Sequence, residues 1–196
     1  MGRRHFVLLC GLGPFFCCPS FCRLKKIGKG DVFHMKALTP SDTRALARGA
    51  IIAAIYTVLS LILAPISYGE VQIRLSEALT LLPILMPVAV PALFVGCLLA
   101  NILGGCTIFD IVFGSLATLL AAVCTRRLRH HFWLAASMPV LFNGVVVGAV
   151  VHFCYAPAMP LLLCMLSVAA GEAVACFVVG PLFIKLMERI PSSLMA

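Results

Sequence analysis

The chain has 196 residues, of which 62% are hydrophobic and 11% are charged, and its mean hydropathy is +1.11. Soluble domains are about 45–50% apolar and about 25% charged, so this composition excludes a soluble globular protein and predicts an integral membrane protein. The apolar runs are continuous rather than alternating, which excludes a β-barrel. The net charge is +8, but basic residues beside apolar helices more often set membrane orientation than bind nucleic acid.

The first 35 residues differ from the rest of the chain. A short apolar run, Phe6–Phe16, lies between two basic patches and contains two glycines and a proline. This run is too short to span a bilayer, and no cleavage site of small residues follows it. We predict that residues 1–35 are a leader, either untranslated because translation starts at Met35 or disordered, and that residues 36–196 form a single membrane domain.

Six apolar stretches follow, and each can form a helix that crosses the membrane wholly or in part. The predicted fold is therefore an all-α integral membrane protein, a bundle of six transmembrane helices. Prolines and glycines set most of the predicted helix ends. The predicted helices are Ala45–Pro65, Ser76–Met86, Val90–Leu103, Phe109–Leu128, Trp133–Phe153 and Pro160–Arg189.

Basic residues near the helix ends predict the orientation. Arg44 and Arg48 lie at the start of the first helix, three arginines lie at the end of the fourth, and Lys185 and Arg189 close the sixth. Because Lys and Arg accumulate in cytoplasmic loops, we expect these clusters and both termini in the cytoplasm. The protein would then be a multi-pass protein of a bacterial cytoplasmic membrane, with the loops after the first, third and fifth helices outside.

A small set of polar residues stands out against the apolar helices. Ionisable groups at membrane depth are costly and indicate a functional site by default. Most of the candidates lie in the half of the membrane that we expect to face outward, where one hydrated pocket would accommodate them. The predicted binding residues are Tyr68, Gln72, Arg74, Glu77, Asn101, Asp110, Asn143 and Glu172.

A plainer interpretation gives these groups local structural roles. Arg74 and Glu77 are three positions apart and could form a pair, Asp110 could cap the fourth helix, and the asparagines could bond neighbouring helices. This interpretation leaves Glu172 unexplained, because no basic residue lies near it in sequence. The two interpretations differ in whether the side chains converge.

The sequence contains no HExxH motif, nucleophile elbow or phosphate-binding loop. We therefore expect no enzymatic activity, no nucleotide hydrolysis by this chain and no cofactor. The ten cysteines are interpreted as small packing residues, and no metal site is expected. His130, His131 and His152 are assigned structural or solvated roles.

The first predicted helix carries a candidate partner surface. Ala50 and Ala54 are four positions apart, and small residues at this spacing flatten a helix face so that another helix can approach closely. That second helix could belong to another protein or to the same bundle.

The segment LAPISYGEVQIRLSEALTLLP, followed by GCLLANILGG and FDIVFGSLATLLAA, resembles the QueT family of queuosine-precursor transporters. The resemblance covers about residues 44–190. It implies the substrate-binding S-component of an energy-coupling-factor (ECF) transporter, which captures a deazaguanine such as preQ1 or preQ0 outside the cell. It also implies the partners, a transmembrane coupling protein facing Ala50 and Ala54 and two ATPase subunits.

The polar candidates suit such a ligand. A carboxylate can accept two hydrogen bonds from a guanine-type edge, an amide or a guanidinium can donate to the ligand carbonyl, and the aminomethyl cation of preQ1 favours a second acid. Glu77, Asp110 and Glu172 would supply the acids, and Tyr68 or Phe153 could stack on the ring.

Three alternatives remain open at this point. The chain could be an S-component for another vitamin-like ligand, such as a thiamine- or pyridoxine-like molecule. It could be an ion-coupled secondary transporter in which Asp110 and Glu172 carry protons. It could also be a membrane assembly factor, which would need no polar pocket.

Overall fold

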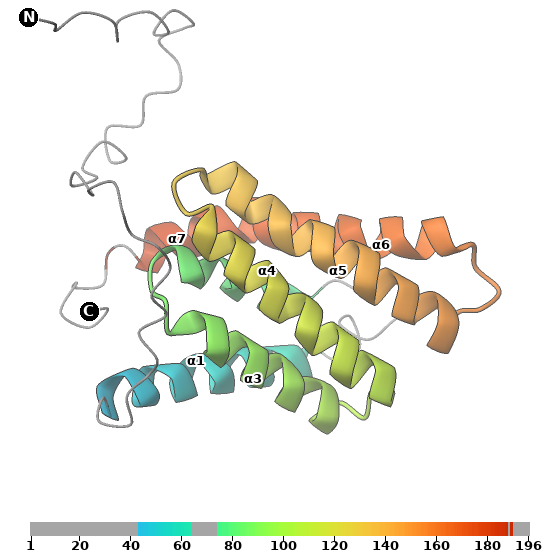
Figure 1. The fold of residues 1–196 in the computed structure, drawn as a ribbon, viewed down its shortest axis with the longest axis horizontal. Helices are drawn as coiled ribbons and strands as arrows, with labels where there is room; N and C mark the ends of the chain where they lie inside the picture. Colours follow the sequence, from blue (N-terminus) through green and yellow to red (C-terminus); the bar gives the residue numbers. More distant parts are fainter. Residues whose placement is uncertain (1–42, 64–73, 188, 190–196) are drawn as a thin grey trace, which may run out of the picture. The chain divides into compact units, whose positions relative to one another are not determined.

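The computed structural model describes residues 43–63, 74–187 and 189. Every regular element within these residues is helical, and each long α-helix packs against the next along the chain (Figure 1). The elements are α1 (Thr43–Ile62), the 3-10 helix η2 (Leu75–Ile84), α3 (Ala89–Leu103), the π-helix η3 (Asp110–Gly114), α4 (Ser115–Arg127), α5 (Phe132–Cys154), α6 (Leu161–Ala173), the π-helix η4 (Val174–Val179) and α7 (Gly180–Met187).

The six predicted helices are all found as helical stretches, with ends within three residues of the predicted ones. Three helices among the described residues are long and apolar enough to cross a membrane, namely α1, α5 and the continuous stretch Leu161–Met187 formed by α6, η4 and α7. The chain is thus a helical membrane protein. The count of six spans and the orientation of the termini stay predictions.

The second predicted helix, Ser76–Met86, differs from expectation because it is the 3-10 helix η2. Its first turn is closed by the Glu77 N–H, which donates to the Arg74 carbonyl at 2.9 Å. Pro83 lies inside η2 and has no N–H to donate. Ten residues at a rise of about 2.0 Å extend about 20 Å, which is less than the hydrocarbon thickness of about 30 Å. This helix alone therefore does not cross the membrane.

Two π-helical segments interrupt the α-helical stretches, and the sequence did not predict them. Segments of this kind occur frequently at functional sites. The first, η3, begins at Asp110, and the second, η4, begins two residues after Glu172. Both therefore adjoin a candidate acid.

Close backbone contact joins α5 to α6. A Cβ atom on Gly148 would lie 2.5 Å from Met165 Cα, and one on Gly144 would lie 2.9 Å from Ala169 Cβ. Absence of these side chains lets the two helices approach, and Val147 and other apolar residues of both helices fill the contact. The two helices that carry Asn143 and Glu172 are thus held in a fixed relation.

A second core joins α1, η2 and α3. Tyr56, Leu79 and Leu93 are buried together there. Gly96 of α3 approaches α1 so closely that a Cβ atom would lie 3.0 Å from the Ala53 carbonyl oxygen. This packing turns the Tyr56 side of α1 toward the interior.

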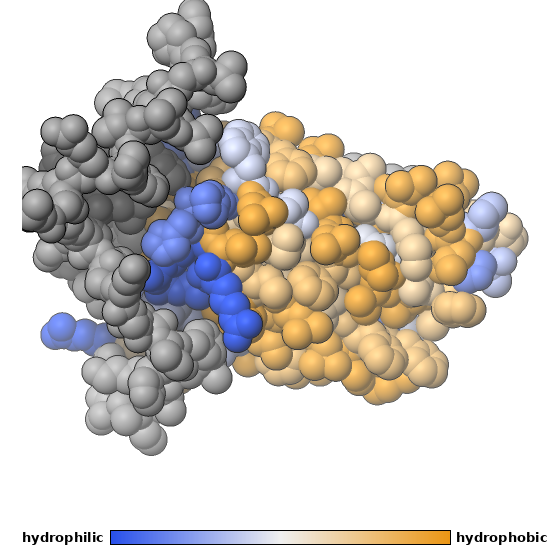
Figure 2. All heavy atoms as spheres, turned by 45° about the horizontal axis from the view of Figure 1, so that its top comes forward, coloured by the Kyte–Doolittle hydropathy of each residue, from blue (hydrophilic) through white to orange (hydrophobic). Residues whose placement is uncertain are grey.

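Apolar side chains cover most of the visible face in Figure 2. Large exposed hydrophobic residues occur on every long helix, including Ile51, Val58, Leu103, Phe153, Leu162 and Leu182. Such a surface is unfavourable in water and suits contact with lipid chains.

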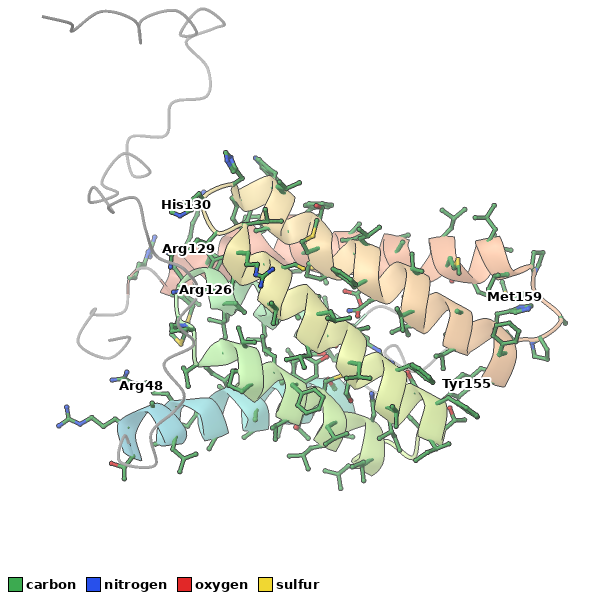
Figure 3. The ribbon with its side chains drawn as sticks, in the orientation of Figure 1. Arg48, Arg126, Arg129, His130, Tyr155 and Met159 are labelled. Carbon is green, nitrogen blue, oxygen red and sulfur yellow. The ribbon has the colours of Figure 1, made fainter. Side chains whose placement is uncertain are left out.

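Basic residues gather at one end of the helices. Figure 3 shows Arg48, Arg126 and Arg129 at one end and Tyr155 and Met159 at the opposite end. This separation is the one that the basic clusters of the sequence predict.

Candidate functional site

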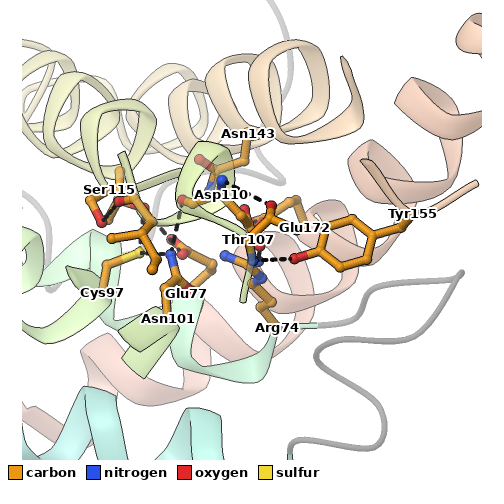
Figure 4. A network of polar contacts seen from close by, with 12 residues as sticks. Arg74, Glu77, Cys97, Asn101, Thr107, Asp110, Ser115, Asn143, Tyr155 and Glu172 are labelled. Carbon is orange, nitrogen blue, oxygen red and sulfur yellow. Dashed lines mark hydrogen bonds and ion pairs between the residues drawn. The ribbon is translucent and has the colours of Figure 1, made fainter. Parts of the chain in front are cut away.

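Six of the predicted binding residues lie in the described part of the chain, and each is at most 3% exposed. They come from the start of η2 and from α3, η3, α5 and α6. Figure 4 shows their side chains gathered in one region inside the bundle. We call this group the polar cluster, and it consists of Arg74, Glu77, Asn101, Asp110, Asn143 and Glu172. The other two predicted binding residues, Tyr68 and Gln72, lie outside the described residues.

An ion pair joins Arg74, the residue before η2, to Asp110, the first residue of η3. Arg74 Nη2 lies 3.3 Å from Asp110 Oδ2, although the residues are 36 positions apart. Asn101 donates from Nδ2 to the Asp110 carbonyl oxygen at 3.2 Å. The Asp110 carboxylate thus pairs with an arginine that is distant in sequence. The backbone N–H of Asp110 donates to the Thr107 hydroxyl at 3.4 Å.

Glu77 is completely buried and accepts hydrogen bonds from two other helices. Tyr56 of α1 donates its hydroxyl to Glu77 Oε1, and Thr118 of α4 donates to the same oxygen at 3.4 Å. Sequence reasoning missed both donors. The available signal was a tyrosine in the middle of an apolar helix, because a buried tyrosine hydroxyl usually needs a partner.

Glu172 and Asn143 bind each other across the α5–α6 contact. Asn143 donates from Nδ2 to Glu172 Oε1 at 3.1 Å. This pair is a second contact within the polar cluster, beside the ion pair of Arg74 and Asp110.

Four acceptor atoms of the polar cluster have no hydrogen-bond partner within the described part of the chain. They are Glu77 Oε2, Asp110 Oδ1, Asn143 Oδ1 and Glu172 Oε2, and all are buried. Most buried polar groups in proteins are satisfied, and each one that is not costs about 1–3 kcal/mol. Because all four atoms are acceptors, the arrangement suits a molecule rich in hydrogen-bond donors.

Gly114 keeps space beside one of these acceptors. A Cβ atom at this position would lie 2.9 Å from Asp110 Oδ1 and 3.3 Å from Asn101 Nδ2. Any larger residue would press on the Asp110 carboxylate. The glycine at the end of η3 therefore spares the Asp110 carboxylate a steric clash.

A hydrogen bond ties together two loops beside the cluster (Figure 4). Tyr155 Oη accepts from the Thr107 N–H at 3.0 Å, and Thr107 is the residue that holds the Asp110 N–H. On the same side, His152 Nδ1 lies 2.8 Å from the Met159 carbonyl oxygen. His152 thus has a structural contact at the end of α5.

Metal binding finds no support in the described residues, where no group of three or more His, Cys, Asp and Glu side chains could hold an ion. Burial raises the pKa of the Cys106 thiol, in the loop after α3, to about 11. This thiol is protonated at neutral pH, and the protonated form is neither a nucleophile nor a good metal ligand.

The chain matches a model of a known protein family over most of its length. The family is described as QueT transporter, and the match covers residues 46–189, which include the whole polar cluster. The chain belongs to the QueT transporter family. It is therefore a transport protein of the membrane and not an enzyme, and the resemblance seen in the sequence is confirmed.

A curated QueT protein is similar along nearly its entire length. It is the Queuosine precursor transporter QueT of Lactococcus lactis subsp. cremoris (strain MG1363), which is 28% identical over 166 residues, or 78% of this chain and 98% of that protein. No solved structure matches this chain.

In this QueT family member, Ala50 and Ala54 are both exposed on the outer side of α1. Ala54 lines a shallow apolar groove together with Ile55 and Val58. Ala53, next to it in sequence, instead faces α3. The candidate partner surface thus points away from the bundle of its own chain.

A second apolar groove of the QueT chain is lined by Phe109, Phe113 and Phe153 with parts of α5 and α6. Phe153 is 73% exposed and lines this groove rather than the polar cluster, so stacking of a ligand on Phe153 at the cluster is not supported. Neither groove contains a residue of the polar cluster. The expected hydrated pocket around the cluster stays a prediction.

Proposed function

We propose that this chain is the substrate-binding S-component of an ECF-type importer. In this function it captures a queuosine precursor of the deazaguanine class, preQ1 or preQ0, outside a bacterial cell. The relative named for queuosine precursor transport supports the ligand class. The observation that carries the proposal is the polar cluster, in which four buried acceptor atoms lack a partner in the described part of the chain.

The chemistry of a deazaguanine fits these atoms. Its N1–H and exocyclic amine form an edge of adjacent donors, which a carboxylate binds well. Glu77 is the best candidate for one donor of this edge, because Tyr56 and Thr118 occupy its Oε1 and Oε2 has no partner in the described part of the chain. The ligand carbonyl then accepts from Asn101 or Gln72.

Partners would supply the energy for uptake. The sequence contains no phosphate-binding loop, so this chain does not supply ATP hydrolysis itself. The family resemblance implies that two ATPases, joined through a transmembrane coupling protein, would supply it. The exposed Ala50 and Ala54 face of α1 would meet the coupling protein, because small residues allow close helix contact. The chain would be a multi-pass protein of the cell membrane with both termini in the cytoplasm.

Binding titrations test the site. We expect the purified chain in detergent to bind preQ1 or preQ0 and not thiamine, pyridoxine or riboflavin. Asp110→Asn and Glu172→Gln should each weaken binding about 10-fold to 150-fold, the equivalent of a lost hydrogen bond to a charged group of about 1.5–3 kcal/mol. Ser137→Ala, a remote change on α5 where the hydroxyl bonds only its own helix, serves as the control. Unchanged affinity in both acid variants would remove the site.

Purification from a native membrane tests the partners. Capture of a coupling protein with two ATPases supports the S-component. Uptake that continues without ATPases and stops when the proton gradient is collapsed would instead support the ion-coupled transporter. Binding of a thiamine-like ligand would keep the S-component and change its substrate.

A further inference from the structure

The polar cluster contains more acid than base. The described residues contain three carboxyl groups, and all three belong to the cluster: those of Glu77, Asp110 and Glu172. The cluster contains one guanidinium group, that of Arg74. The stretch 64–73, which precedes Arg74 directly, contains Glu70 and no Lys, Arg or His in its sequence. Buried negative charge needs a compensating charge or a proton. The cluster therefore favours the arrival of a positive charge.

The three carboxyl groups are compensated to different degrees. Asp110 has a guanidinium at 3.3 Å. Glu77 accepts from the hydroxyls of Tyr56 and Thr118. Glu172 accepts from one neutral amide, that of Asn143. By these contacts Glu172 is the acid that gains most from a cation.

The remaining atoms around Glu172 have the geometry for an ammonium group. Glu172 Oε2 and Asn143 Oδ1 belong to side chains that already touch each other, and both atoms are buried acceptors without a partner in the described part of the chain. The side chains are 2% and 1% exposed. An ammonium group supplies three donors and no acceptor, whereas a nitrile supplies only an acceptor.

We infer that Glu172, positioned by Asn143, selects a ligand that carries an ammonium group, so that the aminomethyl precursor preQ1 binds in preference to the neutral nitrile preQ0. This inference rests on the proposed function and deepens it by naming the charge state of the substrate. An ammonium would form charge-assisted hydrogen bonds to Glu172 Oε2 and Asn143 Oδ1. A nitrile nitrogen at the same place would face two acceptors and leave both without donors.

The test compares three deazaguanines that differ at one substituent, namely the aminomethyl, cyano and uncharged methyl forms, titrated into the full chain by calorimetry. Wild type should bind the aminomethyl form about 10-fold to 150-fold more tightly than the other two, as expected for a hydrogen-bonded charge. Glu172→Gln keeps the size of the side chain and an acceptor for Asn143 but removes the charge. The variant should bind the three ligands with similar affinity, because only the affinity for the aminomethyl form falls.

Glu77→Gln is the matched control, because it removes a charge from the same cluster at the position assigned to the guanine-type edge. It should weaken all three ligands by a similar factor and keep their ratio. Thermal unfolding verifies that each variant is folded. If Glu172→Gln does not fold, Asn143→Ala removes the second acceptor, and the preference for the aminomethyl form should fall in that variant.

Two kinds of failure are distinguishable. If wild type binds none of the three deazaguanines, the proposed function is wrong. If wild type binds all three alike, or if Glu172→Gln keeps the preference for the aminomethyl form, the inference about Glu172 is overturned while the proposed function stands.

Discussion

Tyr56 connects a lipid-facing helix to the polar cluster. Its side chain is 1% exposed, and its hydroxyl donates to the buried Glu77 carboxyl group. The other donor to that oxygen, Thr118, is at the longer distance of 3.4 Å. The phenol is therefore the main group that holds Glu77 in place.

Tyr56→Phe tests this contact at the scale of one atom. The ring still fits, but a buried carboxyl group loses its closest donor, so we expect destabilisation by about 1.5–3 kcal/mol. Thermal unfolding of the chain in detergent measures it. Tyr155→Phe removes a hydroxyl from a residue that is 42% exposed and should have a smaller effect. Equal shifts in the two variants would contradict the role of Tyr56.

The sequence predicted that the six cluster residues lie together, because ionisable groups in membrane helices indicate a functional site. The sequence did not predict which of these residues pair with each other. The rule for residues three positions apart predicts a pair between Arg74 and Glu77 only on a helix, and Arg74 is the extended residue before η2, with φ −91° and ψ 91°. From there its side chain reaches Asp110, which no sequence spacing indicates.

Among the elements, α5 and α6 have the closest contact. The absence of side chains at Gly144 and Gly148 places the two backbones against each other. Because Asn143 precedes Gly144 directly, this contact also fixes how far Asn143 lies from Glu172.

Gly148→Ala tests the contact between these helices. The new Cβ atom would lie 2.5 Å from Met165 Cα, which belongs to the backbone and cannot rotate away. We expect destabilisation by about 1–3 kcal/mol from overpacking, measured by thermal unfolding.

Gly49→Ala is the control for this change. Its Cβ atom would meet Val88 Cγ2 at 3.5 Å, an ordinary contact, and removal of a helical glycine should stabilise α1 by about 0.5–1 kcal/mol. Stability that is unchanged in Gly148→Ala would show that α5 and α6 can separate freely.

Helix positions were predictable because prolines and glycines interrupt the apolar runs, but helix types were not. Hydrophobic periodicity distinguishes structures only where one face is polar. In η2 eight of the ten residues are buried, so its sequence carries no pattern that separates a 3-10 helix from an α-helix. The π segments η3 and η4 adjoin Asp110 and Glu172, and no residue pattern in the sequence indicated them.

At the scale of the whole molecule, the two ends of the helices differ in charge. Arg126 and Arg129 lie at one end, and Tyr155 and Met159 lie at the other (Figure 3). The basic end should face the cytoplasm. The polar cluster is linked to the opposite end through the hydrogen bond between Tyr155 and Thr107.

Epitope insertion tests this orientation. A short tag after His130 should be reached by antibody only after the cell membrane has been permeabilised, and a tag after Ala158 should be reached in intact spheroplasts. Both insertions fall in loops between helices, and ligand binding confirms that the tagged chains fold. Detection of the His130 tag in intact spheroplasts would reverse the predicted topology.

Tyr56 and Ala54 are two positions apart on α1, one directed inward to Glu77 and the other exposed on the outside. A ligand that contacts Glu77 would change the strength of the contact between Tyr56 and Glu77, and with it the attachment of α1 to the other helices. Linkage is reciprocal, so a protein that binds α1 from the lipid side would then change the affinity for the ligand by the same factor. Helix α1 could thus couple occupancy of the interior to binding of a partner on the outer surface.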